Sequence, residues 1–327
     1  LTGGAVAAMV GFANNISYQT MLDKVADNLK PVTGAILILL FVGALAGTWL
    51  ISGVIPAMIY YGLQILHPSI FLPACVIICA LISMATGSSW TTSATVGIAL
   101  IGIGKALGIP VGMVAGAVLS GAYFGDKLSP LSDTTNLAPA MAGADLFTHI
   151  RYMTHTTVPS ILVTLIVFII LGIGFSGDGT ANSQELLAAM NEVFTINLLL
   201  FIVPIIVIVM IVRKTPPLVA LFLGTILGTI AALIFQQELL LSLSGESKLS
   251  VYGTYQVIID AITVSTEIET TSAALTDLFQ SGGMEGMLGT IWLIICAMAF
   301  GGVMDAIGAL STISAALLSI AQSTFQL

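Results

Sequence analysis

Nearly a hundred consecutive residues of this chain carry a single formal charge. Between Pro31 and Gly125 the only formally charged side chain is that of Lys105. About a quarter of the residues in a typical soluble domain are charged, whereas the share here is 7%. Such a segment can lie in a lipid bilayer at little ionic cost. The chain is therefore predicted to be an integral membrane protein.

Apolar runs of the right length for membrane crossing occur along the chain. A helix needs about 20 apolar residues to cross a bilayer. Five runs approach or exceed that length, at 34–66, 157–174, 193–212, 216–236 and 287–325. These runs predict an all-α polytopic membrane protein with the lipid bilayer as its partner. The formal net charge of -8, with basic residues scattered, argues against nucleic acid.

Glycine and proline interrupt these runs. Breaks in the first run are expected at Gly43, Gly47, Gly53 and Pro56, and further glycines follow from Gly87 to Gly121. Interrupted apolar segments are typical of binding sites in transporters, because broken backbone at membrane depth must be buried or line a cavity. The sequence therefore favours a secondary transporter with broken helices.

A faint internal repeat is visible at an offset of 255 positions. It superposes three pairs of glycines within apolar stretches: Gly34 on Gly289, Gly47 on Gly302 and Gly53 on Gly308. Repeats of this kind are common in transporters. We expect a first transmembrane repeat over 1–175 and a second over 176–327. Because the chain starts at Leu1 and stops just after an apolar run, both repeats are expected to be incomplete.

Loop charges orient the middle of the chain by the positive-inside rule. Arg151, between His149 and His155, precedes one apolar run, and the loop after that run is acidic, with Asp178, Glu185 and Glu192. Basic residues, Arg213 and Lys214, follow the next run, and an acidic loop with Glu238 and Glu246 comes later. These ends are predicted to alternate inside, outside, inside, outside. The rule leaves the first 150 residues unoriented.

A run of hydroxyl side chains spans residues 83–95. Its members are Ser83, Thr86, Ser88, Ser89, Thr91, Thr92, Ser93 and Thr95. Hydroxyls and unwound backbone carbonyls supply the oxygen ligands that sodium prefers, without burying a compensating charge. The alternative is a close-packed helix interface, where membrane proteins also use Ser and Thr.

A second polar cluster occupies residues 121–140. Asp126, Lys127 and Asp133 follow the uncharged stretch, and Pro130 prevents one continuous helix. Hydroxyl and amide groups accompany them: Ser129, Ser132, Thr134, Thr135 and Asn136. Burial disfavours an ionised carboxylate, so a proton can compete with a bound cation there. The alternative is a surface loop in which Ser132 and Asp133 cap the next helix.

Other polar residues are weaker candidates. Asp305 is the only charge between 286 and 327, which makes it a candidate for a site in the second repeat. Glu267 and Glu269 either line a pathway or lie on a wet surface. The cysteines lack the neighbours of a zinc site, and no motif of a hydrolase or phosphate-binding loop is present. The sequence predicts neither a cofactor nor an enzyme.

The residues at these clusters resemble the NhaC-type sodium/proton antiporter family. The resemblance covers roughly residues 34–160. It is carried by GTW at 47–49, IPAMIYYGL at 55–63, TGSSWTTSATVGIAL at 86–100, SGAYFGDKLSPLSDTTNLAPA at 120–140 and DLFTHI at 145–150. It implies a multi-pass carrier of the prokaryotic cytoplasmic membrane, built from inverted repeats and re-entrant hairpins. Members exchange sodium for protons, and a related branch exchanges malate and protons for lactate and sodium.

Transferred to this chain, the resemblance implies a hairpin tip facing a helix break. The tip would hold Ser88, Ser89, Thr91 and Thr92, and the break Asp126, Ser129, Asp133 and Thr134. We infer that sodium binds at Ser88, Ser89 and Asp133, and that sodium and protons exchange by alternating access around a midplane site. An organic-acid exchanger is the main alternative; a sodium channel and an intramembrane hydrolase fit less well. The sequence is also compatible with a homo-oligomer.

Overall fold

The computed structural model of the chain is almost entirely helical. It describes residues 1–65, 67–130, 132, 135, 138–139, 144–174, 187–213, 215–248, 250–270, 276 and 279–320. Within these residues the strands are β1 (Thr266–Glu267) and β2 (Gln280–Ser281), which pair antiparallel with Thr266 opposite Ser281. The chain forms two compact units, a terminal unit of residues 1–40 and 287–327 and a central unit of residues 41–286.

The terminal unit joins segments from both ends of the sequence. Its helices are α1 (Thr2–Ala13), α2 (Tyr18–Leu29), η1 (Lys30–Val32), α17 (Leu288–Ala306) and α18 (Ala309–Ile320). Helices α1 and α2 pack on α17 around Ala7, Met21 and Val303. A Cβ on Gly302 would lie 2.6 Å from Cα of Val25. The absence of a side chain at Gly302 therefore lets α17 approach the backbone of α2.

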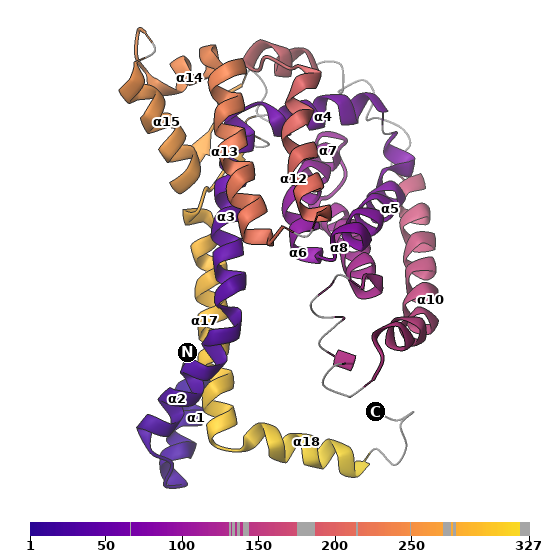
Figure 1. Cartoon of the computed structure of the whole chain (residues 1–327), viewed down its shortest axis with the longest axis vertical. Coiled ribbons are helices and arrows are strands. Elements are labelled where there is room, and N and C mark those ends of the chain that lie inside the picture. Colours follow the sequence, from indigo (N-terminus) through magenta and orange to yellow (C-terminus); the bar gives the residue numbers. More distant parts are fainter. Residues whose placement is uncertain are drawn as a thin grey trace. The chain divides into compact units, whose positions relative to one another are not determined.

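The central unit contains the remaining helices, and α3 (Thr33–Ile51) runs into it from the terminal unit. They are α4 (Val54–Ile65), α5 (Pro68–Thr86), α6 (Ser89–Thr92), the π-helical η2 (Ser93–Gly97), α7 (Ile98–Ala106), α8 (Val111–Leu128), α10 (Leu146–Ile173), η3 (Leu198–Phe201), α12 (Ile202–Val212), α13 (Pro217–Phe235), α14 (Gln237–Ser244) and α15 (Val251–Thr263); η4 (Glu285–Met287) follows β2. Helices α5, α8 and α10 lie side by side (Figure 1).

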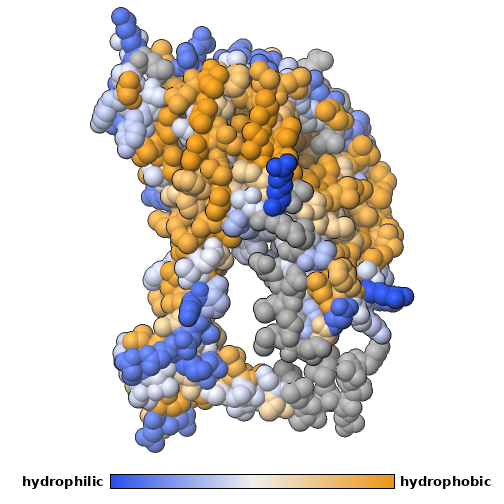
Figure 2. Space-filling view, in the orientation of Figure 1, coloured by the Kyte–Doolittle hydropathy of each residue, from blue (hydrophilic) through white to orange (hydrophobic). Residues whose placement is uncertain are grey.

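Five helices of the described part are long and apolar enough to cross a membrane: Tyr18–Ile51, Pro68–Ala85, Leu146–Ile173, Pro217–Phe235 and Glu285–Ala306. A sixth is added if the helices at 187–193 and 198–211, bent by 86°, form one broken span. Figure 2 shows apolar residues over much of the visible face of the central unit. Exposed apolar residues on α10 include Leu162, Val163, Ile166 and Ile170. These features confirm an α-helical membrane protein.

The helix boundaries differ from the apolar runs in three places. The run at 34–66 is two helices, because Gly53 adopts a left-handed φ of 78° between α3 and α4. The run at 287–325 is broken after Ala306, where Gly308 has a φ of 70°. Residues 68–85, which sequence length did not single out, form a full span. Apolar length alone does not record where the backbone turns.

Gly43 and Gly47 were expected to break the first run, and this expectation is wrong. Both lie inside α3. A Cβ on Gly43 would collide with the carbonyl of Gly283, and one on Gly47 with the carbonyl of Ala261. These glycines therefore serve close packing, since they let the end of α15 and the segment after β2 touch the backbone of α3.

Glycines also set the packing around the polar clusters. Helices α5 and α8 make the most extensive helix contact of the described part. A Cβ on Gly121 would collide with the carbonyl of Val76, and one on Gly125 with the carbonyl of Ala80. The residue numbers in the two pairs increase in the same direction along both helices, so α5 and α8 are parallel. Their carboxyl-terminal ends, Thr86 and Leu128, are thereby placed together.

Candidate functional site

The two polar clusters of the sequence meet at the ends of α5 and α8. Helix α5 ends at Gly87, which has a left-handed φ of 69° and reverses the chain. Ser88 then caps α6 by accepting a hydrogen bond from the Thr91 amide at 3.2 Å. The next residue, Ser89, lies with its Oγ 3.5 Å from Oδ2 of Asp126 on α8. A hydroxyl tip and a carboxylate that are 37 residues apart in sequence are thus neighbours.

The hydroxyls of the tip have different partners. Thr91 Oγ1 lies 2.9 Å from Ser88 Oγ. Thr92, Ser93 and Thr95 donate to backbone carbonyls four residues earlier, at 2.8 to 2.9 Å. Ser89, Thr91 and Thr92 are buried. The tip therefore combines helix capping with buried oxygen atoms, and cation binding by its hydroxyls stays a prediction.

The carboxylate side of the site lies where α8 ends. Ser129 is extended, with ψ of 126°, and Pro130 follows, as the break predicted from Pro130 requires. Thr135 Oγ1 donates to the carbonyls of Asp126 and Lys127 at 3.1 and 3.3 Å. Asp126 is 7% exposed, and Ser129, Ser132 and Thr135 are also buried. The acidic group is therefore held in a protein interior rich in oxygen atoms.

Some candidates from the sequence are not in this cluster. Asp133 and Thr134 lie outside the described residues, so the predicted sodium ligation by Asp133 stays a prediction. Asp305 lies in the terminal unit, where its Oδ2 is 3.0 Å from Nζ of Lys24. Glu267 is exposed and accepts a hydrogen bond from Gln280. Asp305 and Glu267 each have a partner of their own.

Ser83 is a member of the hydroxyl run that was not predicted to bind sodium. Its hydroxyl donates to the carbonyl of Ala122 on α8 at 2.5 Å, and its side chain is fully buried. Ser83 belongs to the hydroxyl run, but only the parallel packing of α5 on α8 reveals its role. It links the two helices one turn before the Asp126 level.

The chemistry of the cluster suits a hard monovalent cation better than a transition metal. Among the described residues it offers the carboxylate of Asp126 together with hydroxyl and carbonyl oxygens, and oxygen donors are the ligands that hard cations prefer. Within the described residues no group of three or more His, Cys, Asp or Glu side chains comes together. A single buried carboxylate can be neutralised either by a cation or by a proton.

Apolar membrane-spanning helices around a buried carboxylate and hydroxyl cluster define an α-helical membrane protein of the transporter class. The model of the Na+/H+ antiporter family matches residues 121–327, and the chain belongs to this family. The match begins in the half of α8 that carries Asp126. It continues beyond residue 160, where the sequence resemblance ended. No solved structure matches the chain.

Three relatives illustrate the range of the family. The Malate-2H(+)/Na(+)-lactate antiporter of Bacillus subtilis is 37% identical over 310 residues, which cover 94% of this chain and 63% of the relative. The Na(+)/H(+) antiporter NhaC of Alkalihalophilus pseudofirmus is 36% identical over 308 residues, 94% of this chain and 64% of the relative. The Arginine/ornithine antiporter ArcD of Halobacterium salinarum is 30% identical over 302 residues, which cover 91% of this chain and 59% of the relative. The chain thus spans about three fifths of the length of these relatives.

Proposed function

We propose that this protein exchanges sodium ions for protons across a prokaryotic cytoplasmic membrane. The observation that carries the proposal is the burial of Asp126 beside Ser89, at the meeting point of two helix ends. A carboxylate is stabilised there either by sodium, with help from nearby oxygen atoms, or by a proton. Family membership and the NhaC relative support this choice.

Exchange follows if the same carboxylate accepts one ion at a time. Sodium binding requires the ionised carboxylate of Asp126, and protonation removes that charge, so each ion displaces the other. A conformational change between inward and outward access then carries sodium one way and protons the other. Asp133 and Thr134, predicted at the same break, complete the proposed oxygen shell. Ser88, Thr91, Thr92 and Ser129 support the tip and the break.

The proposed architecture is a pair of inverted repeats, over 1–175 and 176–327, with re-entrant hairpins. The chain reversal at Gly87 between α5 and α6 supports a hairpin tip in the first repeat. The second repeat rests on the glycine pairs at an offset of 255. Gly53 and Gly308, one such pair, both have a left-handed φ and both stand at a helix break.

Sodium-coupled exchange of organic acids is the second candidate. It is favoured by the 37% identity to the relative named as a malate and lactate antiporter. An organic acid needs a partner for its carboxylate, and a helix N-terminus such as the one that begins at Ser89 is a kind of group that can supply it. Both candidates use Asp126, and they differ in whether protons move without an organic acid.

The proposal is tested with the full-length protein reconstituted in liposomes that contain a pH-sensitive dye. Added sodium should drive proton efflux from the wild type without malate or lactate. Asp126→Asn should abolish this flux, because the amide cannot alternate between an ionised and a protonated form. Asp145→Asn is the matched control: Asp145 is exposed at the start of α10, and its replacement should leave the flux intact.

The other outcomes discriminate between the candidates. A flux that appears only after malate or lactate is added transfers the function to organic-acid exchange. Full sodium-driven flux in the Asp126→Asn variant removes Asp126 from the site. Loss of flux in both variants, with both proteins folded, would mean that the assay does not report on the buried carboxylate.

A further inference from the structure

The helix registers around Asp126 give the site a depth and a side in the membrane. We infer that the Asp126–Ser89 cluster lies at the cytoplasmic end of the apolar layer, away from its midplane, and is reached from the cytoplasm. The inference deepens the proposed function by naming the side of access. It rests on that proposal only for the identity of the bound ion.

The first step is the direction of α10. Near its end, a Cβ on Gly172 would collide with the carbonyl of Ser69, at the start of α5. A Cβ on Gly116, near the start of α8, would lie 3.6 Å from Cζ of Phe168. The end of α10 therefore packs against the starts of both α5 and α8. Helix α10 runs antiparallel to these two parallel helices.

The second step is the level of the cluster along α10. Helices rise about 1.5 Å per residue. Ser83 lies about 21 Å beyond Ser69 on α5, and the same distance back from Gly172 leads to Val158. Asp126 lies about 15 Å beyond Gly116 on α8, and the same distance back from Phe168 again leads to Val158. Two independent registers thus place the cluster within about one helical turn of Val158.

Val158 stands at the edge of the apolar part of α10. From this residue to Ile173 the helix has no ionisable side chain. Toward the start of α10, His155 lies three residues from Val158, and Arg151 lies seven residues from Val158, about 10 Å along the helix. Tyr152, which is 73% exposed, is of a residue type that is enriched where membrane proteins meet lipid headgroups. The cluster is therefore near one membrane surface.

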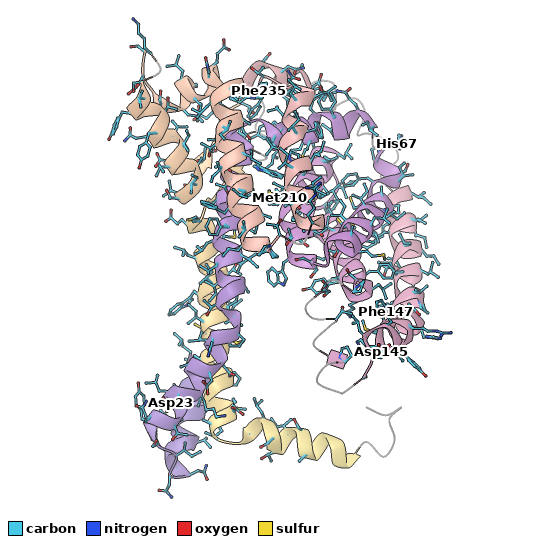
Figure 3. All side chains as sticks on the ribbon, in the orientation of Figure 1. Asp23, His67, Asp145, Phe147, Met210 and Phe235 are labelled. Atoms are coloured by element: carbon cyan, nitrogen blue, oxygen red, sulfur yellow. The ribbon has the colours of Figure 1, made fainter. Side chains whose placement is uncertain are left out.

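Figure 3 shows the two ends of this bundle. Asp145 and Phe147 at the start of α10 lie at one end, and His67 before the start of α5 lies at the other. Phe235, which ends α13, lies toward the end that holds His67. Glu238, on α14, and Glu246, after it, follow α13 in the sequence, with Lys248 as the base nearby. The charge distribution along the chain thus matches the two ends seen in the structure.

The basic residues assign the sides. Arg151 lies at the end that carries the cluster, with His149 and His155, and Lys127 follows Asp126 on α8 at the same end. Lys105 lies at the opposite end, because its neighbour Gly104 contacts Phe71 and Val114 near the starts of α5 and α8. The loop after α10 carries three acidic residues and no base. The positive-inside rule makes the Arg151 end cytoplasmic.

This assignment also orients α5 and α8, which loop charges alone left open. Both begin at the outer side and point toward the cytoplasm, so the hairpin tip at Gly87 lies beyond the midplane on the cytoplasmic side. A midplane position, as first expected for the site, would require Asp126 to be level with the middle of the apolar part of α10. The packing of Gly116 and Gly172 places it about eight residues closer to the cytoplasmic end.

The test is side-specific labelling of single cysteines in the full-length protein in membrane vesicles. Trp90→Cys reports on the cluster, because Trp90 follows Ser89 and is 50% exposed. Tyr152→Cys reports on the Arg151 end and His67→Cys on the opposite end. The background carries Cys296→Ala and keeps Cys75 and Cys79, which are fully buried. This background protein without an added cysteine is the labelling control.

A membrane-impermeant maleimide should label the Trp90→Cys and Tyr152→Cys variants in inverted vesicles and the His67→Cys variant in right-side-out vesicles. Sodium should slow the labelling of the Trp90→Cys variant several-fold, with no effect on the Tyr152→Cys variant. Labelling of the Trp90→Cys variant from the side of His67, or from neither side, would overturn the inference. Labelling of the Tyr152→Cys variant in right-side-out vesicles would also overturn it, because the Arg151 end would then be periplasmic. The sidedness is read without any transport, so a failed exchange assay leaves it intact.

Discussion

Asp126 is the one acidic side chain classed as buried among the described residues. Its partner Ser89 was singled out from the sequence, as was Asp126 itself, because hydroxyls and carboxylates in uncharged surroundings are unusual. The 3.5 Å approach of the two side chains required the structure, since it depends on how α5 and α8 pack. Ser83 shows the same limit, because its partner is a backbone carbonyl of another helix.

Asp145 offers a pH-dependent prediction at the residue scale. Its carboxylate caps α10 by accepting hydrogen bonds from the Thr148 amide and hydroxyl, both at 2.9 Å. These bonds, the amide bond first, lower the pKa of Asp145 below its ordinary value. A lowered pKa in the folded state means that the cap stabilises the protein above the ordinary carboxyl range. This stabilisation is lost as the pH falls through the lowered pKa.

Asp145→Ala should therefore lower the unfolding midpoint at neutral pH, and its difference from the wild type should shrink as the pH falls below about 4. Asp145→Asn should keep the cap at all pH values, because the amide oxygen also accepts the bonds. Thermal unfolding of the detergent-solubilised protein across a pH series measures both. A constant difference between the alanine variant and wild type at every pH would contradict the account.

At the scale of elements, one buried amide joins three helix boundaries. Gln236, between α13 and α14, is 2% exposed. Its amide nitrogen donates to the carbonyl of Ser52 at 3.3 Å and to that of Thr195 at 3.0 Å, and its oxygen accepts from the Thr195 amide at 3.0 Å. The break before Gly53 and the 86° bend between 193 and 198 are thus held by the same side chain.

Gln236→Leu should destabilise the central unit, because it removes the partner of the buried Ser52 carbonyl and the partners of the part-buried amide and carbonyl of Thr195. A buried group left without a partner costs about 1–3 kcal/mol. The matched control is Gln237→Leu, since the neighbouring glutamine is exposed and should tolerate the change. Chemical denaturation of the two variants in the same detergent compares them. Equal stability of the two variants would show that the three boundaries are held in another way.

At the scale of the whole molecule, the terminal unit brings together segments far apart in sequence. Lys24 and Asp305 form an ion pair at 3.0 Å, and each side chain is nearly half exposed. An exposed pair of this kind contributes little to stability, because water and salt screen it. It is therefore more useful as a marker of which segments meet than as a source of stability.

A cross-linking experiment uses this marker. Lys24→Cys combined with Asp305→Cys should be joined by a short bifunctional maleimide, so that cleavage at a protease site inserted at the exposed Gly245 turn leaves one covalent product. Lys24→Cys with Trp292→Cys is the control, because Trp292 lies 13 residues from Asp305, about 20 Å along α17. Two separate fragments from the first pair would contradict the terminal unit.

The sequence by itself determined the class of the protein, the chemistry of its candidate site and several helix breaks. Charge, apolar length and residues such as Pro130 act locally, so they are readable without a fold. Only the tertiary structure decided that Ser89 meets Asp126, that Gly43 and Gly47 admit neighbouring backbone and that Gln236 joins three boundaries. These contacts depend on helix registers, which are set by the packing of many side chains distant in sequence.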